Sequence, residues 1–180
     1  MAPLWGAMTP PDLAPGSEFD LASDPRYRGI AIPKTESLKT TLARVLPSFP
    51  QCNALYDAAR NTIVQHRSLH VGVAAQTPDG LKVPVVRNAQ ALDLWQLGAE
   101  IRRLSERART NQSTRQELTG STITVTSLGK LGGIASTPVI NHPEVAIVGI
   151  NRIVARPMVR EGTIQVRQMM NFSSSFDHRV

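Results

Sequence analysis

The sequence predicts an α/β fold with two layers, in which a mixed sheet carries helices on one face. Three segments lead to this prediction. Residues 121–127 alternate threonine with apolar residues, as a strand with one apolar face does. Residues 145–150 form a continuous apolar run that suits a central strand covered on both faces. Between residues 94 and 108, apolar side chains recur at steps of three and four, which is typical of an amphipathic helix.

The first part of the chain has no sustained period. Residues 1–34 are rich in Pro, Asp, Ser and Gly, so we expect a linker or a disordered tail there, and one folded domain over residues 35–180. A first helix is predicted over residues 36–46, where Leu38, Leu42, Val45 and Leu46 would lie on one side. Pro47 is expected to end it. Residues 53–57 are expected to form a short extended segment.

Two strands are predicted next, on either side of a turn at residues 78–80. Residues 70–75 have the composition of a buried strand, and residues 82–86 form the second strand. Pro84 cannot donate a backbone hydrogen bond, so it indicates an edge strand or a bulge.

Helix starts are marked by two capping boxes. Asp93 with Gln96 precedes the amphipathic helix, and Thr114 with Glu117 precedes one short turn that Gly120 ends.

The last third of the chain is predicted to be mostly strands. Gly129, Gly132 and Gly133 are expected to form a flexible connection before the apolar strand. Side chains at 164, 166, 170 and 172 alternate in a way that predicts a single strand, which delivers His178.

Composition favours a cytoplasmic protein of one domain. The chain has 180 residues, and its one cysteine, Cys52, excludes an internal disulfide and is expected to be a small buried residue. No apolar run approaches the about 20 residues of a membrane span, and the first residues lack the pattern of a secretory signal.

The net charge of +6 raises the possibility of a nucleic-acid partner. The arginines at 102, 103, 107 and 109 fall on the predicted helix, without the interleaved aromatic residues that single-strand binding requires. We therefore do not expect nucleic-acid binding. A solvated helix face and a surface that attracts acidic partners, such as a phosphorylated cofactor, both stay open.

Other kinds of site find little support. His66 and His70 are four apart, but a strand is expected to begin near His70 and no third ligand is placed near them, so no metal is expected. His142 lies in a turn next to proline and is interpreted as structural. Residues 129–133 lack the lysine and the spacing of a phosphate-binding loop.

Four ordered segments between residues 49 and 180 resemble one protein family. Residues 77–85 look like its turn and paired strands, and residues 120–129 look like its threonine-rich strand and glycine turn. Residues 137–147 follow in the expected order, and residues 171–179 (Asn-Phe-Ser-Ser-Ser-Phe-Asp-His-Arg) resemble its active-site strand. The family is that of the dihydrolipoamide acyltransferases, the E2 cores of 2-oxo acid dehydrogenase complexes. The resemblance implies a chloramphenicol-acetyltransferase-like fold.

The sequence departs from the family pattern in three respects. The family signature continues for five positions after its histidine, whereas this sequence ends at Val180. The family's usual N-terminal strand is not recognisable in residues 1–34, and no lipoyl domain is recognised. Residues 35–180 are therefore interpreted as a partial acyltransferase catalytic domain that ends inside the active-site signature. The lipoyl group is expected on another chain or domain.

The resemblance implies transfer of an acyl group between dihydrolipoamide and coenzyme A. His178 would act as the general base that takes the thiol proton, and Thr126 would donate a hydrogen bond to the thioester oxygen. Asp177 and Arg179 would support the active-site turn rather than react. Taken alone, a histidine near the end of a chain and a threonine in a strand are more simply structural residues.

The resemblance also implies a homotrimer or a larger core, in which the histidine of one subunit faces the hydroxyl of its neighbour. Lipoyl-bearing domains and the E1 and E3 components would be its partners. One alternative is a catalytically inactive truncated core that acts only as an assembly or interaction piece. A further alternative, that the chain is a basic nucleic-acid-binding module, rests on its net charge alone.

Overall fold

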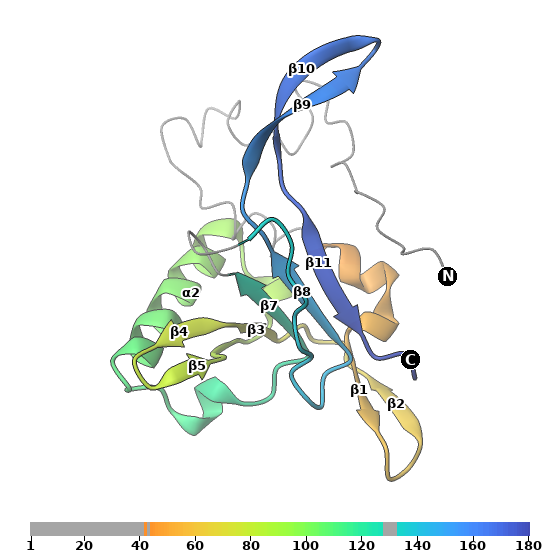
Figure 1. Cartoon of the computed structure of the whole chain (residues 1–180). Helices are drawn as coiled ribbons and strands as arrows, with labels where there is room; N and C mark the ends of the chain where they lie inside the picture. The colour runs from red at the N-terminus through yellow and green to blue at the C-terminus, as the bar shows by residue number, and fades with distance from the viewer. Residues whose placement is uncertain (1–41, 43, 128–132) are drawn as a thin grey trace.

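The computed structural model describes residues 42, 44–127 and 133–180 (Figure 1). The predicted tail at 1–34, most of the predicted helix at 36–46, and Gly129 and Gly132 lie outside the described residues. Leu42, Arg44 and Val45, at the end of that predicted helix, are helical. Among the described residues, no helix is long and apolar enough to cross a membrane.

A five-stranded mixed sheet forms the centre of the domain (Figure 1). Its order is β11-β8-β7-β3-β6, in which β3, β7 and β8 run parallel and the two outer strands run antiparallel to their neighbours. The strands are β3 (Val71–Val73), β6 (Val85–Val86), β7 (Ile123–Ser127), β8 (Ala146–Ile150) and β11 (Phe172–Phe176). The predicted α/β fold with a mixed sheet is confirmed.

Three two-stranded antiparallel pairs lie outside this sheet. They are β1 (Ala54–Asp57) with β2 (Thr62–Gln65), β4 (Ala75–Thr77) with β5 (Gly80–Lys82), and β9 (Val154–Arg160) with β10 (Thr163–Met169). The β9–β10 hairpin projects away from the body of the domain (Figure 1). The helical elements are η2 (Leu46–Ser48), η3 (Pro50–Cys52), η4 (Ala89–Ala91), α2 (Leu94–Arg109) and η5 (Arg115–Leu118).

One face of the sheet is apolar and packs against α2. Strand pairing places Val71 beside Ile123 and Val73 beside Val125, so that these side chains share one face. They form a buried cluster with residues of α2 and β8, namely Leu97, Ile101, Leu104, Ala146 and Ile150. The helix therefore covers the face that the alternation in β7 predicts to be buried.

The opposite face of the sheet is built from small and polar residues. Gly72 pairs with Thr124, Thr126 pairs with Gly149, and Gly149 pairs in turn with Ser173. A Cβ atom at Gly72 would lie 2.7 Å from Thr124 Oγ1. This face therefore has no room for larger side chains at the two glycines.

The two capping boxes are placed as predicted, whereas the strand predicted over residues 82–86 is divided into two strands at Pro84. Asp93 accepts hydrogen bonds from the backbone N–H groups of Trp95 and Gln96, both at 2.8 Å, and α2 begins directly after it. Thr114 caps η5 in the same way. Pro84 lies between β5 and β6, and β6 is an edge strand of the central sheet.

The prediction for the C-terminal strands is wrong in one respect. Residues 164–172 do not form one strand, because β10 ends at Met169 and β11 begins at Phe172. β10 pairs with β9, a strand that the sequence reading missed, and β11 pairs with β8. Ile164 and Val166 are 76% and 75% exposed, so their alternation belongs to the projecting hairpin and not to the core.

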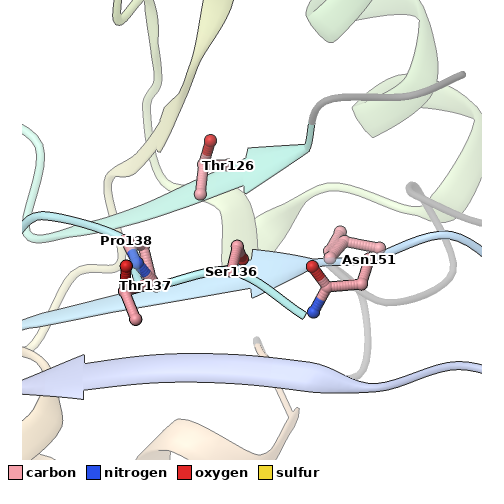
Figure 2. Close-up of a pocket in the computed structure, with 6 residues that line it drawn as sticks. Thr126, Ser136, Thr137, Pro138 and Asn151 are labelled. Atoms are coloured by element: carbon pink, nitrogen blue, oxygen red, sulfur yellow. The ribbon is translucent and has the colours of Figure 1, made fainter. Parts of the chain in front are cut away.

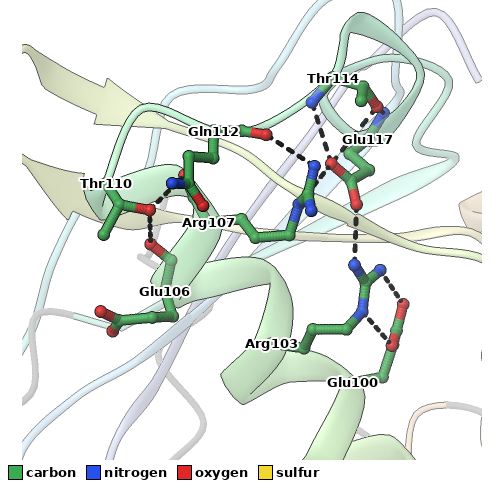
Figure 3. A network of polar contacts seen from close by, with 8 residues as sticks. All are labelled: Glu100, Arg103, Glu106, Arg107, Thr110, Gln112, Thr114 and Glu117. Atoms are coloured by element: carbon green, nitrogen blue, oxygen red, sulfur yellow. Dashed lines mark hydrogen bonds and ion pairs between the residues drawn. The ribbon is translucent and has the colours of Figure 1, made fainter.

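The basic face of α2 is partly neutralised by one carboxylate of η5 (Figure 3). Glu117 accepts hydrogen bonds from Arg103 Nη1 at 2.9 Å and from Arg107 Nε at 3.1 Å, and Arg103 also contacts Glu100. The Thr114 backbone N–H donates to Glu117 Oε2 at 2.9 Å. Two of the four helix arginines are thus engaged within the chain, which argues against a continuous surface for phosphates.

These contacts make the stability of the domain depend on Glu117. The hydrogen bond from the Thr114 backbone, together with Arg103 and Arg107, lowers the pKa of Glu117 to about 2. A lowered pKa in the folded state stabilises the fold above the unfolded pKa of about 4.3, and this stabilisation is lost as pH falls toward 2. Glu117→Gln should therefore lower the free energy of unfolding at pH 7 by about 1–2 kcal/mol and weaken its dependence on pH below 4.5.

Urea unfolding at pH 7 and pH 3 measures both effects. Glu106→Gln, which changes an exposed carboxylate on α2, is the matched control and should change stability by less than about 0.5 kcal/mol. Equal losses in the two variants would contradict a specific contribution from Glu117.

Candidate functional site

The polar face of the sheet is covered by the segment from Gly133 to Glu144, which we call the covering segment. Three hydrogen bonds attach it to β11 and to the residue before it. The Ser136 backbone N–H donates to Ser173 Oγ at 3.1 Å, Ser175 Oγ donates to the Pro138 carbonyl at 2.6 Å, and Asn171 Nδ2 donates to the Ile134 carbonyl at 2.8 Å. The segment has no helix or strand, so these side chains replace the backbone pairing that a strand would provide.

A pocket of about 160 Å³ lies between the covering segment and the ends of β7 and β8 (Figure 2). We call it the Thr126 pocket. Thr126 lies on one side of it, and Ser136 and Pro138 lie on the other (Figure 2). The complete lining is Thr126, Ser136, Thr137, Pro138, Ile150 and Asn151. Thr126 is half-buried, and its backbone is paired with Gly149 in the sheet.

Asn151 is the most firmly held polar residue of this pocket. It is buried, and its Nδ2 donates to Ser173 Oγ and to the Asn171 carbonyl, both at 2.9 Å. Ser173 is itself 2% exposed and therefore links the covering segment, Asn151 and β11. This shared partner connects Ser136 and Asn151, which both line the Thr126 pocket.

A buried carboxyl group anchors the far end of the covering segment. Glu144 Oε1 accepts hydrogen bonds from Ser121 Oγ, from Thr124 Oγ1 at 2.8 Å and from Asn141 Nδ2 at 3.0 Å. Glu144 Oε2 is buried with no hydrogen-bond partner among the described residues. Burial raises the pKa of Glu144, against the effect of its three donors. The group thus ties the start of β7 to the turn before β8.

The turn that carries His178 is held by its neighbours rather than by the histidine itself. The Asp177 backbone N–H donates to the Val145 carbonyl at 2.8 Å. Arg179 forms hydrogen bonds to both carboxylate oxygens of Asp177 and lies 4.0 Å from the centre of the Tyr56 ring. Hydrogen bonds from the Arg179 side chain and backbone lower the pKa of Asp177 to about 2. His178 is exposed.

Within one protomer, Thr126 and His178 lie toward opposite ends of the sheet. Thr126 pairs with Gly149 near the end of β8, whereas Phe176, two residues before His178, pairs with Ala146 at its beginning. Three residues along a strand correspond to about 10 Å. Thr126 lies near the end of the central strand β7 and His178 follows the edge strand β11, so the fold of one chain does not bring them together.

The other candidates from the sequence do not form a second catalytic cluster. His70 Nδ1 accepts a hydrogen bond from the Asn88 backbone at 3.1 Å, and burial lowers its pKa. Cys52 is half-buried beside the core, and burial raises its pKa. In the part of the chain that the structure describes, no group of three or more His, Cys, Asp or Glu side chains could hold a metal ion.

Sequence reasoning missed Ser136, Asn151 and Ser173. Their role depends on the covering segment crossing the sheet, and no periodicity in residues 133–144 indicates that path. A weak signal existed in the three consecutive serines at 173–175, because alternate strand residues face one side.

The fold defines a class of catalytic domain known from solved structures. Dihydrolipoamide acetyltransferase from Azotobacter vinelandii matches with a TM-score of 0.79 and 36% sequence identity, over 86% of this chain and 64% of that chain. Residues 28–180 also match the family described as 2-oxoacid dehydrogenases acyltransferase (catalytic domain). The chain belongs to this family, as its sequence resemblance predicts.

Curated relatives agree with this assignment. The lipoamide acyltransferase component of a branched-chain alpha-keto acid dehydrogenase complex from Pseudomonas aeruginosa is 61% identical over 135 residues, which cover 75% of this chain and 32% of the relative. A dihydrolipoyllysine-residue acetyltransferase component of a pyruvate dehydrogenase complex from Bacillus subtilis is 38% identical over 153 residues, covering 85% of this chain and 35% of the relative. The chain thus spans about a third of the length of the curated relatives it matches.

The attachment of the covering segment can be tested through Ser173. Ser173→Ala removes the acceptor of the Ser136 N–H and one acceptor of Asn151, both at least partly buried. We expect it to lower the free energy of unfolding by about 1–3 kcal/mol, measured by chemical denaturation. Ser174→Ala on the exposed face of the same strand is the control and should be close to neutral. Equal stability of the two variants would contradict the linking role of Ser173.

Proposed function

We propose that the chain is an acyltransferase domain that moves an acyl group between a dihydrolipoamide sulfur and coenzyme A. Membership of the family supports the reaction class. The observation that supports the site is the number of positions between its two proposed catalytic residues, Thr126 and His178. The Azotobacter structure was determined to examine a serine, a histidine and an asparagine in the catalytic mechanism of that enzyme. Its serine and histidine are separated by the same number of positions as Thr126 and His178 here.

His178 is the proposed general base. A thiol with a pKa of about 8.5 is mostly protonated near neutrality, and only the thiolate is a strong nucleophile. The imidazole takes the S–H proton as the sulfur attacks the carbonyl carbon of the thioester. When the tetrahedral intermediate collapses, the C–S bond to the leaving thiol breaks and His178 returns the proton to that sulfur. The exposed position of His178 leaves its ring accessible to a thiol that arrives from solvent or from a neighbouring subunit.

Thr126 is the proposed donor to the oxyanion. Attack on the thioester places negative charge on its oxygen, and one fixed donor contributes about 2.7–4 kcal/mol in comparable sites. Threonine carries the hydroxyl that serine supplies, with a methyl group that limits the rotation of its side chain. Ser136 and Pro138 line the same pocket as Thr126.

The separation of the two residues supports an assembly in which they come from different subunits. We propose a homotrimer, or a larger core built from trimers, with each site at a subunit boundary. Lipoyl-bearing domains and the E1 and E3 components are the proposed partners. A branched-chain acyl group is the favoured substrate, because identity to the branched-chain relative is 61% against 38% for the acetyltransferase relative.

Site variants test the residue roles. In an assay of transfer from isobutyryl-coenzyme A or acetyl-coenzyme A to free dihydrolipoamide, His178→Ala should lower kcat by about 10²-fold or more. Thr126→Val should lower it by a similar factor, about 10²–10³-fold, while Thr126→Ser should keep most of it because the hydroxyl remains. His142→Ala changes an exposed histidine of the covering segment that does not line the Thr126 pocket, and it should be neutral. A folded wild-type chain without turnover would favour the interpretation as an inactive assembly piece.

Mixing two inactive variants tests the subunit arrangement. Thr126→Val chains keep the base and His178→Ala chains keep the donor, so a site at a boundary can contain both intact residues. Random assembly from equal amounts, after unfolding and joint refolding, should restore about a quarter of the wild-type rate, because half of the chains supply each residue. Each variant refolded alone is the control. Mixtures no more active than the single variants would contradict a site shared between subunits.

A further inference from the structure

The outer edge of β11 has no partner strand in the part of the chain that the structure describes. β11 is the last strand of the central sheet, and it pairs with β8 on one side only. The Asp177 backbone N–H donates to the Val145 carbonyl. The Asn171 carbonyl accepts from the Asn151 backbone N–H, so the odd-numbered residues bond inward to β8. The even-numbered residues therefore direct their N–H and C=O groups toward the free edge, and these residues are Phe172, Ser174 and Phe176.

This edge lacks the features that usually protect an edge strand. Residues 172–176 contain no proline and no charged side chain, and their pairing with β8 has no bulge. The side chains of Phe172 and Phe176 are 40% and 52% exposed and lie on one face of the strand with Ser174. An unprotected edge beside exposed aromatic side chains is typical of a site where another strand is added to the sheet.

The β9–β10 hairpin has an exposed apolar face of its own. Strand pairing places Val159 opposite Ile164 and Pro157 opposite Val166, so these four side chains share one face. All four are exposed, and the hairpin projects away from the domain (Figure 1). A hairpin of two strands has no second layer to cover such a face, and it gains stability when it packs against another element.

Of the two strands in the hairpin, β10 has the edge that is better able to pair. Directly opposite residues in antiparallel strands either bond each other or both point outward. Pro157 has no N–H and lies opposite Val166, so this pair fits the outward position. The free edge of β9 therefore lacks a donor. Val166 and the alternate residues Ile164 and Gln168 direct complete backbone groups toward the free edge of β10.

We propose that the free edge of β10 in one chain pairs with the free edge of β11 in a second copy of the chain. Ile164 and Val166 then lie on the same face as Phe172 and Phe176, and the contact covers both apolar surfaces. A second copy is the partner because β11 leads directly to His178, and the proposed acyl-transfer site needs another chain there. The inference rests on that proposed function.

The two edges are different surfaces, so the contact is heterologous, and such contacts close into rings when the rotation between subunits allows it. The ring expected here is a trimer, in which every β10 edge and every β11 edge is used once.

Two proline variants test the two edges separately. Ser174→Pro removes an outward N–H from β11 and Val166→Pro removes one from β10, and neither change removes a hydrogen bond inside the chain's own sheets. Analytical ultracentrifugation over a range of concentrations should give trimers for the wild type and folded monomers for each variant. Ser174→Ala keeps the N–H and should stay trimeric. A monomeric wild type, or trimers of either proline variant, would overturn the inference.

A mixture of the two proline variants separates this contact from pairing between two β11 edges. Ser174→Pro chains keep the β10 edge and Val166→Pro chains keep the β11 edge. The mixture should therefore form dimers with one chain of each kind, which cannot close into a ring. Dimers of Val166→Pro alone would show that β11 pairs with itself, and a mixture that stays monomeric would refute the contact.

A side-chain variant gives a test that leaves the backbone of the strands unchanged. Ile164→Glu places a charge on the exposed apolar face and should raise the dissociation constant of the trimer at least tenfold. Leu81→Glu changes a similarly exposed residue of β5 and should leave it unchanged.

Acyl transfer measured on the same samples separates the two proposals. Trimers that require both edges but transfer no acyl group would refute the proposed function alone. Active trimers that persist in Ile164→Glu and in both proline variants would refute the strand pairing alone.

Discussion

The rest of the site depends on how the covering segment is attached to the polar face of the sheet. The segment can approach because Gly149 has no side chain: a Cβ there would lie 3.0 Å from Ser136 Oγ and 3.2 Å from the Ser173 carbonyl oxygen. At this distance the backbone and small side chains can exchange hydrogen bonds directly. The serines of β11 then supply the partners that a strand would otherwise provide. Without this close contact the Thr126 pocket would have only one wall.

Glu144 shows how strongly the same segment is held at its other end. A carboxyl buried in the domain is costly unless its oxygens are satisfied, and here three donors converge on a single oxygen. The pKa of the group is nevertheless raised, because burial outweighs the donors. The cluster works as a polar link between the start of β7 and the turn before β8.

The sequence was informative where a feature depends on neighbouring residues. The capping boxes at Asp93 and Thr114 and the two faces of β7 follow from local spacing, and the structure confirms them. β9 was missed, and β10 was joined to β11 because the alternation at Ile164 and Val166 is the pattern of a half-buried strand, although both side chains are exposed. The Ser173 and Glu144 contacts could not be predicted either. Apart from the Asn141–Glu144 bond, they join positions 20 or more residues apart, and a local pattern carries no information about which distant group will accept the bond.

The parallel centre of the sheet explains why one protomer separates the two proposed catalytic residues. β7 and β8 run in the same direction, so Thr126 lies near the end where both strands finish. β11 runs the opposite way, so its last residue, Phe176, lies where β8 begins. No change of side-chain rotamer bridges such a distance along a rigid sheet. The His178 turn is nevertheless held by Val145, Asp177 and the Arg179–Tyr56 contact within its own chain. The proposed pairing of the two residues therefore requires that His178 of one chain faces Thr126 of a second chain.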